Sequence, residues 1–369
     1  MRAFALEKLE PQAAKLDLEQ RFPDEYLKPL AEEGLLSCLV PEEYGGRPVD
    51  TLSYIIAVEE ASRVCGSTGI MLAAHNSLGT FPILEFGTEA QRRKYLPRAA
   101  AGELIAFGLS EPDAGSDAGG TRTMAKKTPG GWVINGSKCW ITSATRAFCT
   151  IATARTSEDP EDKRITSFLL EKAWKGYSVG KKENKLGLRG SDTAFLHFDD
   201  LEVTDDAQLG KVGDGFKQAL ITLDGGRISI GAMALGLGQG ALDCALKYAS
   251  ERVQFGRPIS YNQAIQHRLA DMATEIQAAR LMIYEAAVMK DAGVPYSRQS
   301  AMCKLFASEV ATRAATTAMT VMGAVSYLTG RYPVERIWRD VKLCEIGEGT
   351  SEIQRLVIAR DLLKTMQTV

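Results

Sequence analysis

The chain has 369 residues, of which 45% are hydrophobic and 24% charged, and its net charge at pH 7 is −2. This composition is typical of a globular protein with two or three domains, and it excludes a disordered chain, a collagen and a coiled coil. We find no basic run that would bind nucleic acid and no apolar stretch that is predicted to cross a membrane. Because Glu7 and Glu10 lie where a signal peptide needs apolar residues, we expect a cytoplasmic protein.

Residues 1–103 are predicted to form a helical domain. Apolar residues recur there at every third or fourth position, the spacing of a helix with one buried face. Asp50 and Thr88 are expected to cap helices at their N-termini, and Pro41 and Pro97 are expected to interrupt helices. The predicted helices cover residues 3–20, 25–40, 52–65 and 90–103.

Residues 104–212 are predicted to form a separate domain of β-strands. Short apolar runs alternate there with turn dipeptides such as Gly130-Gly131 and Asn135-Gly136, which favour tight turns because glycine adopts positive φ easily. The predicted strands cover residues 104–109, 131–136, 136–143, 149–155, 165–171 and 193–203.

Residues 213–369 are predicted to form a bundle of long helices. One apolar face runs through residues 265–279, and the next helix is predicted to bury Met302, Leu305, Phe306 and Val310. The fold class is therefore α+β and mostly α, with one β domain between two helical domains.

Two sets of residues suggest a cofactor or metal site, and their spacing argues against both. Gly236, Gly238 and Gly240 resemble part of a dinucleotide fingerprint, but they lie inside a helical stretch, so close helix packing is the better interpretation. The seven cysteines and three histidines are dispersed without metal-ligand spacing. We therefore expect no metal site, and we expect reduced cysteines that are mostly buried.

Two segments are candidates for chemistry. Residues 107–123 follow a predicted strand and are rich in Gly and Ser, a composition that can bind a polar ring or an anion, although a surface turn is the commoner outcome. Glu348 lies between Gly347 and Gly349, which are expected to break the helix so that the carboxylate projects from a turn. A solvated acidic helix face is the alternative. A new helix is expected to begin at Thr350-Ser351.

Seven short motifs follow one another along the chain: PEEYGG (41–46), LSEPDAGSD (109–117), WITS (140–143), KLGLRGSDT (185–193), LDGGRI (223–228), ERVQFGRPI (251–259) and GEGTSEIQR (347–355). In this order, and over essentially the whole chain, they resemble the acyl-CoA dehydrogenase family. The resemblance implies an N-terminal helical domain, a middle β-barrel and a C-terminal four-helix bundle. It also implies a homotetramer that binds FAD non-covalently between the middle and C-terminal domains, with help from a neighbouring subunit.

The resemblance assigns residues to the cofactor and the substrate. Residues 107–116 and 140–142 are expected to line the flavin, residues 252–263 to reach the FAD of the neighbouring subunit, and residues 350–352 to complete the flavin pocket. The expected FAD-binding residues are Phe107, Leu109, Ser110, Gly115, Ser116, Trp140, Ile141, Thr142, Arg252, Gln254, Phe255, Gln263, Thr350 and Glu352. The expected substrate-binding residues are Ser116, Asp224, Arg227 and Gly349.

The resemblance also assigns the general base to Glu348. It implies that Glu348 removes the α-proton of an acyl-CoA while a β-hydride passes to flavin N5, which gives the trans-2-enoyl-CoA. A desolvated carboxylate with a raised pKa suits this task, and the backbone N–H of the base is expected to bind the enolate oxygen. Some members carry the base at the position of Gly226, so that alternative base is absent here, and Gly226 favours a short or short-branched substrate. An electron-transfer flavoprotein is the expected acceptor.

The chain departs from the family pattern at two places. Gly347 replaces a residue that is often Tyr, which would open the wall beside the thioester to a bulkier or branched acyl group. Thr320 and Ala324 replace a Gln and a Gly, which puts one FAD contact in question. Three alternatives stay open: a dehydrogenase of carrier-protein-bound acyl or aminoacyl groups, an enoyl-CoA reductase running in reverse, and a non-catalytic acyl-CoA-binding homologue, the last suggested by Thr320 and Ala324.

Overall fold

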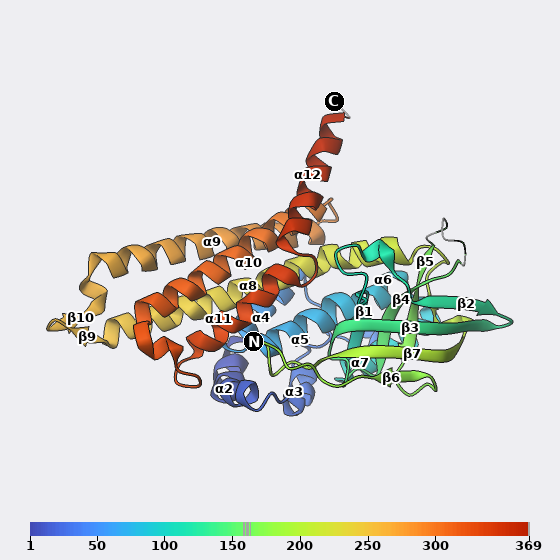
Figure 1. Ribbon diagram of the computed structural model, residues 1–369, viewed down its shortest axis with the longest axis horizontal. Coiled ribbons are helices and arrows are strands. Elements are labelled where there is room, and N and C mark those ends of the chain that lie inside the picture. The colour runs from blue at the N-terminus through green and yellow to red at the C-terminus, as the bar shows by residue number, and fades with distance from the viewer. Residues whose placement is uncertain (158, 160–161, 163, 368–369) are drawn as a thin grey trace.

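The computed structural model describes residues 1–157, 159, 162 and 164–367. Long C-terminal helices occupy one end of the elongated molecule and the β-strands occupy the other (Figure 1). Buried residues of the N-terminal helices and of the C-terminal helices belong to one continuous hydrophobic core. The strands have one core of their own and share a second with N-terminal residues between Val40 and Ala99. The predicted fold class, a β domain between two helical domains, is confirmed.

The N-terminal part consists of short helices with the predicted caps. The backbone N–H of Ser53 donates to Asp50 Oδ1 at 2.6 Å, and Thr88 and Gln91 form a capping box, in which each side chain accepts a hydrogen bond from the other residue's backbone N–H. The helices are α1 (Arg2–Phe4), α2 (Glu10–Leu18), α3 (Leu27–Glu32), α4 (Thr51–Val64), α5 (Gly66–Ala74), α6 (Phe81–Phe86) and α7 (Glu89–Ala100).

Three predictions about these helices are wrong. The helix predicted over 25–40 ends at Glu32, because Gly34 adopts a φ of 76° and the Leu35 N–H closes the end on the Leu30 carbonyl at 2.8 Å. Pro97 does not interrupt its helix but lies in the last turn of α7. Residues 66–86 are helical although no helix was predicted there, because glycines required for close packing hide the apolar spacing.

The middle part is an eight-stranded mixed sheet. The hydrogen-bonded order is β6-β7-β3-β2-β4-β5-β8, and β1 pairs in parallel with β4. The strands are β1 (Ile105–Gly108), β2 (Met124–Thr128), β3 (Gly131–Thr142), β4 (Cys149–Arg155), β5 (Ile165–Glu171), β6 (Tyr177–Val179), β7 (Thr193–Thr204) and β8 (Gln208–Leu209).

The turn predicted at Asn135-Gly136 is wrong, because both residues lie inside the continuous strand β3. The pairing of β3 with β7 shifts register between Ile134 and Gly136, which marks a bulge rather than a turn. Gly136 has a φ of 145°, and a Cβ there would lie 2.7 Å from the Cα of Thr123. A glycine is therefore required at position 136 because the backbone near Thr123 approaches it closely.

The C-terminal part is built around the long helix α8 (Gly215–Glu251). A Cβ at Gly236 would overlap the Glu59 carbonyl oxygen of α4, whereas a Cβ at Gly238 would make an ordinary contact of 3.4 Å with Ala311. The interpretation as a helix-packing residue is therefore confirmed for Gly236, whereas Gly238 has room for a side-chain carbon. The other helices are α9 (Gln263–Asp291), α10 (Ser297–Met322), α11 (Pro333–Ile346) and α12 (Ser351–Gln367).

By length and composition alone, helix α8 meets the criteria for a membrane-spanning helix, although its uncharged run between Arg227 and Asp243 is shorter than a span needs. Its most apolar 18-residue window has a mean hydropathy of 1.3. However, 78% of that window is buried inside the protein. This is the position of a core helix, so the composition of α8 follows from its place at the centre of the bundle.

The buried face of α10 differs from the predicted one. Met302 is 38% exposed and Leu305 and Phe306 are only half-buried, although Val310 is buried as expected. The buried positions carry small residues, together with a single lysine, Lys304. Small side chains allow α10 to pack closely against α8, which is why apolar size alone predicted the wrong face.

All seven cysteines are free, as expected. Six are buried and Cys244 is half-buried. Burial raises the pKa of the Cys38 thiol to about 12, so this thiol stays protonated and unreactive at neutral pH. The cysteines therefore behave as small core residues.

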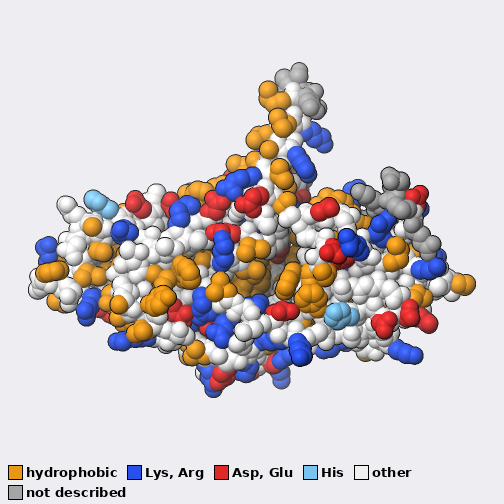
Figure 2. All heavy atoms as spheres, in the orientation of Figure 1, with side chains coloured by type: hydrophobic (Ala, Val, Ile, Leu, Met, Phe, Trp, Pro, Cys, Tyr) orange, Lys and Arg blue, Asp and Glu red, His pale blue; other side chains and the backbone are white. Residues whose placement is uncertain are grey.

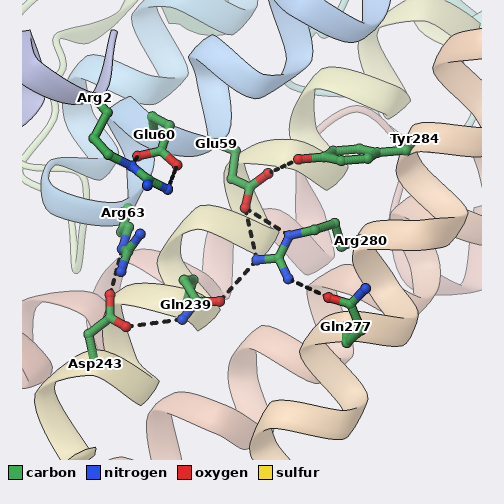
Figure 3. Close-up of polar contacts among 9 residues, drawn as sticks. All are labelled: Arg2, Glu59, Glu60, Arg63, Gln239, Asp243, Gln277, Arg280 and Tyr284. Carbon is green, nitrogen blue, oxygen red and sulfur yellow. Dashed lines mark hydrogen bonds and ion pairs between the residues drawn. The ribbon is translucent and has the colours of Figure 1, made fainter.

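A polar network joins the N-terminal helices to the bundle (Figure 3). Buried Glu59 of α4 accepts hydrogen bonds from Arg280 Nη2 at 2.9 Å and from the Tyr284 hydroxyl at 2.8 Å, both on α9. Its sequence neighbour Glu60 pairs instead with Arg2 at 2.6 Å, and the Arg2 side chain is 65% exposed. Only the Glu59 contacts are largely removed from solvent.

We expect Glu59→Ala to destabilise the fold by about 3 kcal/mol, because it leaves a half-buried guanidinium and a phenol without their acceptor. Glu60→Ala is the matched control, and it should cost less than about 1 kcal/mol because its partner is solvated. Urea unfolding of both variants at saturating FAD measures the two values. Equal losses would contradict this account of the network.

Candidate active site

Glu348 lies on the short turn that joins α11 to α12. Gly347 ends α11, Glu348 has a φ of 54°, and Gly349 has a φ of 98°. Thr350 then caps α12, because its Oγ1 accepts the backbone N–H of Ile353 at 3.3 Å. The break between two helices and the new helix start were both predicted. A left-handed φ at a non-glycine residue is unfavourable, so the surrounding structure must hold this turn.

Glu348 is half-buried overall, but its carboxylate Oε2 is buried and has no hydrogen-bond partner among the described residues. It lies against α8 at Gly226, where an added Cβ would overlap Oε2 and would also lie 3.0 Å from Leu78 Cδ2. Burial raises the pKa of Glu348 to about 7, although the charges of Lys304 and Arg227 act in the opposite direction. A carboxylate that titrates near neutral pH can accept a proton from a weak acid.

Two buried side chains hold the backbone of this turn. Lys304 Nζ donates to the Gly349 carbonyl at 2.7 Å. Gln354 Nε2 donates to the same carbonyl at 2.9 Å and to the Glu348 carbonyl at 3.2 Å. In the part of the chain that the structure describes, the Glu348 N–H makes no hydrogen bond. That donor is therefore available to a bound ligand.

Asp224 and Arg227, both predicted to bind substrate, meet on one face of α8. Arg227 Nη1 donates to Asp224 Oδ1, and the Ser297 hydroxyl of α10 donates to Asp224 Oδ2. Arg227 is buried and its Nε has no partner. Burial raises the pKa of Asp224, against the influence of Ser297 and Arg227. Asp224 and Arg227 lie on the helix that also carries Gly226, beside the Glu348 carboxylate.

The predicted flavin-lining residues of the β domain lie along β1, β3 and the loop that follows β1. The Cys139 N–H donates to the Ser110 carbonyl at 2.9 Å, which ties the loop to β3. Phe107, Leu109, Ser110 and Thr142 are half-buried, Ile141 is buried, and Gly115 and Ser116 are exposed.

Trp140 has the features of a residue in a binding surface. It is 61% exposed and its φ is 61°, which is unusual for a bulky residue. Its ring packs edge-on against Phe195 with 5.3 Å between centroids. An exposed aromatic ring that is fixed in this way suits contact with a planar ligand.

The remaining predicted cofactor residues lie far from Trp140 in the single chain. Arg252 and Phe255 belong to the hairpin of β9 (Val253–Gln254) and β10 (Arg257–Pro258), at the opposite end of the molecule from the β domain (Figure 1). Phe255 is 98% exposed, and Gln254 and Gln263 are exposed as well. One chain therefore does not bring these residues together with the β domain.

Thr350 and Glu352 remain with Glu348 at the start of α12, where Glu352 is exposed. Thr320 of α10 is exposed too, and its hydroxyl donates to the Thr316 carbonyl of its own helix at 3.0 Å. The Thr320 hydroxyl is therefore bonded within its own helix.

Sequence reasoning missed four contributors to this region. Lys304 and Gln354 hold the Glu348 turn, and Leu78, on the π-helical turn His75–Thr80, lies beside the carboxylate. Lys138 is fully buried on β3, where its Nζ bonds Glu111 at 2.6 Å and the Leu109 carbonyl at 3.2 Å. A lysine within a run of small or apolar residues was the available signal for both lysines.

This site places a glutamate whose pKa is raised toward neutrality on a turn between two helices, an arrangement suited to acid–base chemistry on a bound ligand. The family follows from comparison with known proteins. Models of the acyl-CoA dehydrogenase N-terminal, middle and C-terminal domains match residues 1–103, 106–201 and 213–363. The chain therefore belongs to the acyl-CoA dehydrogenase family, and it is an FAD-dependent oxidoreductase.

Individual relatives can be aligned with this sequence over nearly its whole length. A mitochondrial short-chain specific acyl-CoA dehydrogenase from Mus musculus is 46% identical over 368 residues, which cover 100% of this chain and 89% of the relative. Butyryl-CoA dehydrogenase from Megasphaera elsdenii is 41% identical with a TM-score of 0.95, covering 98% and 96% of the two chains. A structure from a study of the electron transferring flavoprotein of Acidaminococcus fermentans is 45% identical with a TM-score of 0.96, covering 98% and 95%.

The residues of the β domain fit FAD. Trp140 offers an exposed ring, and Thr142 and Ser110 add polar groups beside it. Near Glu348, the Ser351 hydroxyl and Gln354 Oε1 are buried without a partner. Buried polar atoms of this kind are normally satisfied, which is consistent with a polar ligand at this place.

Proposed function

We propose that this enzyme dehydrogenates a short or branched acyl-CoA between its α and β carbons and forms the trans-2-enoyl-CoA. The observation that carries the proposal is Glu348. Its carboxylate Oε2 is buried and unpaired, and desolvation raises its pKa to about 7. The α-proton of a thioester is weakly acidic, so its removal needs a desolvated base of this kind.

The chain's own residues account for proton removal. Glu348 takes the α-proton on its carboxylate, while its free backbone N–H binds the thioester oxygen as negative charge develops there. FAD, when bound, supplies the oxidising power by accepting a hydride. Asp224 and Arg227 lie near the base and line the approach of the CoA portion.

Support for a short or branched acyl group comes from two sources. The relatives include enzymes described as short-chain specific and as butyryl-CoA dehydrogenase. In addition, Gly347 has no side chain beside the base, and a Cβ there would make only ordinary contacts with Leu343, the nearest at 3.5 Å. Space next to the thioester favours a substituent on the acyl chain.

We further propose a cytoplasmic homotetramer that passes electrons to an electron-transfer flavoprotein. The exposed hairpin with Phe255 suits contact with the FAD of a second subunit. Helix α12 projects from the body and carries hydrophobic side chains, including exposed Leu356, Leu362 and Leu363 (Figure 2). A patch of this kind on an isolated chain favours an interface between subunits. The acceptor is suggested by the relative from the Acidaminococcus study.

A substrate panel tests the proposed function. Purified flavoprotein is mixed without oxygen with butyryl-CoA, isobutyryl-CoA, isovaleryl-CoA, octanoyl-CoA or a butyryl group on an acyl carrier protein. We expect a four- or five-carbon CoA thioester to remove the flavin absorbance with a kcat/KM at least about 10-fold above octanoyl-CoA. Bleaching by the carrier-bound group alone, or fastest bleaching by octanoyl-CoA, would overturn the proposal.

A further inference from the structure

Lys304 is a fully buried lysine on α10 that holds the turn of the base. Its Nζ donates to the Gly349 carbonyl, and within the described residues no carboxylate lies close enough to form an ion pair with it. We propose that Lys304 is a positioning residue of the dehydrogenation, which fixes the Glu348 turn through this hydrogen bond and places a positive charge that favours the ionised base. This inference rests on the proposed role of Glu348.

The hydrogen bond has a clear structural task. Glu348 and Gly349 are consecutive residues with positive φ, and the first of them is not a glycine. Such a conformation persists only when the surroundings hold it. Lys304 reaches the turn from a different helix, 45 residues away in sequence, whereas Gln354 reaches it from the helix that follows the turn. Lys304 therefore anchors the turn to the bundle.

Of the two cations near the base, Lys304 and Arg227, Lys304 is the one without a carboxylate partner among the described residues. Arg227 on α8 is paired with Asp224. On α11, Glu345 pairs with Lys342 at 2.5 Å and accepts the Thr312 hydroxyl, and Cys344 is a buried thiol. Tyr54 of α4 is a buried phenol, and the negative charge of Glu348 helps to raise its pKa. Burial lowers the pKa of Lys304 to about 8, so at neutral pH it is a cation outside any ion pair of the described residues and favours ionised Glu348.

Three substitutions separate the hydrogen bond from the charge. Lys304→Met removes both, Lys304→Gln keeps a donor without charge, and Lys304→Arg keeps the charge. Lys342→Met is the matched control, because it removes an exposed lysine of the neighbouring helix. The measurement is the pH profile of flavin reduction by the best acyl-CoA, together with the FAD content of each variant.

Removal of the charge should shift the acid limb of the profile to higher pH by about one unit in the Met and Gln variants. The Arg and Lys342→Met variants should keep the wild-type limb. At pH 9, where the base is ionised, the Met variant should be about 10-fold slower than the Gln variant because it has lost the anchor as well. A wild-type limb in both the Met and Gln variants overturns the proposal. If those variants do not fold, a full-unit shift in Lys304→Arg overturns it.

A second readout needs no turnover. The difference in unfolding free energy between a protein and its Glu348→Gln derivative follows the ionisation of Glu348. In the wild-type background this difference should level off above pH 7, and in the Lys304→Met background about one unit higher. An unchanged levelling point overturns the role of Lys304. A wild type that no acyl-CoA reduces overturns the proposed function instead, so the two failures are distinguishable.

Discussion

Glu348→Gln is expected to slow the reduction of bound flavin by substrate by about 10³-fold or more. Gln has nearly the shape of Glu but cannot accept the α-proton, and the carboxylate of Asp224 on α8 is already bonded by Arg227 and Ser297. Lys304 and Arg227 are cations, and the chain has glycine at position 226, the point of α8 that touches the carboxylate. Anaerobic stopped-flow measurement of flavin absorbance with the best acyl-CoA checks this result.

The FAD content of Glu348→Gln should remain that of the wild type, because the exposed aromatic surface at Trp140 belongs to the β domain and is unchanged. The FAD-to-protein ratio is therefore the control for this variant. Full bleaching at a rate within a few-fold of wild type would show that another group is the base.

The same substitution should also stabilise the folded protein at alkaline pH. The pKa of Glu348 is about 7 in the folded chain against an ordinary value of 4.5, so the folded state favours the protonated carboxyl. Its contribution to stability is fully present below about pH 4.5 and is lost as the pH rises through 7. The loss corresponds to about 3 kcal/mol at about 1.4 kcal/mol per pKa unit.

Gln does not titrate, so the free energy of unfolding of Glu348→Gln should be equal to or below that of the wild type at pH 5 and above it at pH 8. Urea unfolding at the two pH values measures the difference. Glu275→Gln controls for the loss of a carboxylate as such, because the Glu275 side chain on α9 is 41% exposed and, among the described residues, pairs only with the half-exposed Arg313. A parallel pH dependence in the wild type and Glu348→Gln would mean that this carboxyl is not desolvated.

The turn that carries Glu348 could be predicted because its signal is local. Gly347 and Gly349 flank the glutamate in the sequence, and the cap at Thr350 follows directly. The contacts that hold the turn could not be predicted in the same way. Lys304 is 45 residues distant, and its position on the buried face of α10 depends on how closely α10 packs against α8.

Two of the errors in the fold have a common physical cause, which is the close approach of a glycine to the backbone of another segment. Gly79 is needed where a Cβ would lie 2.8 Å from the Ile105 carbonyl, and Gly136 where one would meet Thr123. In the sequence the first resembles a helix breaker and the second a turn residue. Tertiary contacts decide such positions, so helix 66–86 was missed and β3 was divided.

The close approach of Gly226 to Glu348 leads to the prediction that the base can be moved. A Cβ at residue 226 would fall in the space that Oε2 of Glu348 now occupies. In Glu348→Gly the carboxylate is gone and that space is open. We therefore expect the double variant Glu348→Gly with Gly226→Glu to reduce its flavin at least about 10-fold faster than the single variant Glu348→Gly.

Gly225→Glu in the same Glu348→Gly background is the matched control. Gly225 is the preceding residue of α8, but a Cβ there would face Lys290 Nζ at 3.3 Å and the Tyr296 hydroxyl at 3.9 Å. A glutamate at position 225 lies one residue earlier on the same helix but points toward Lys290 and Tyr296. It should therefore not raise the rate of flavin reduction above that of Glu348→Gly. Recovery by both double variants would mean that any nearby carboxylate suffices. Recovery by the 226 variant alone would show that catalysis depends on where the carboxylate lies and not on which helix supplies it.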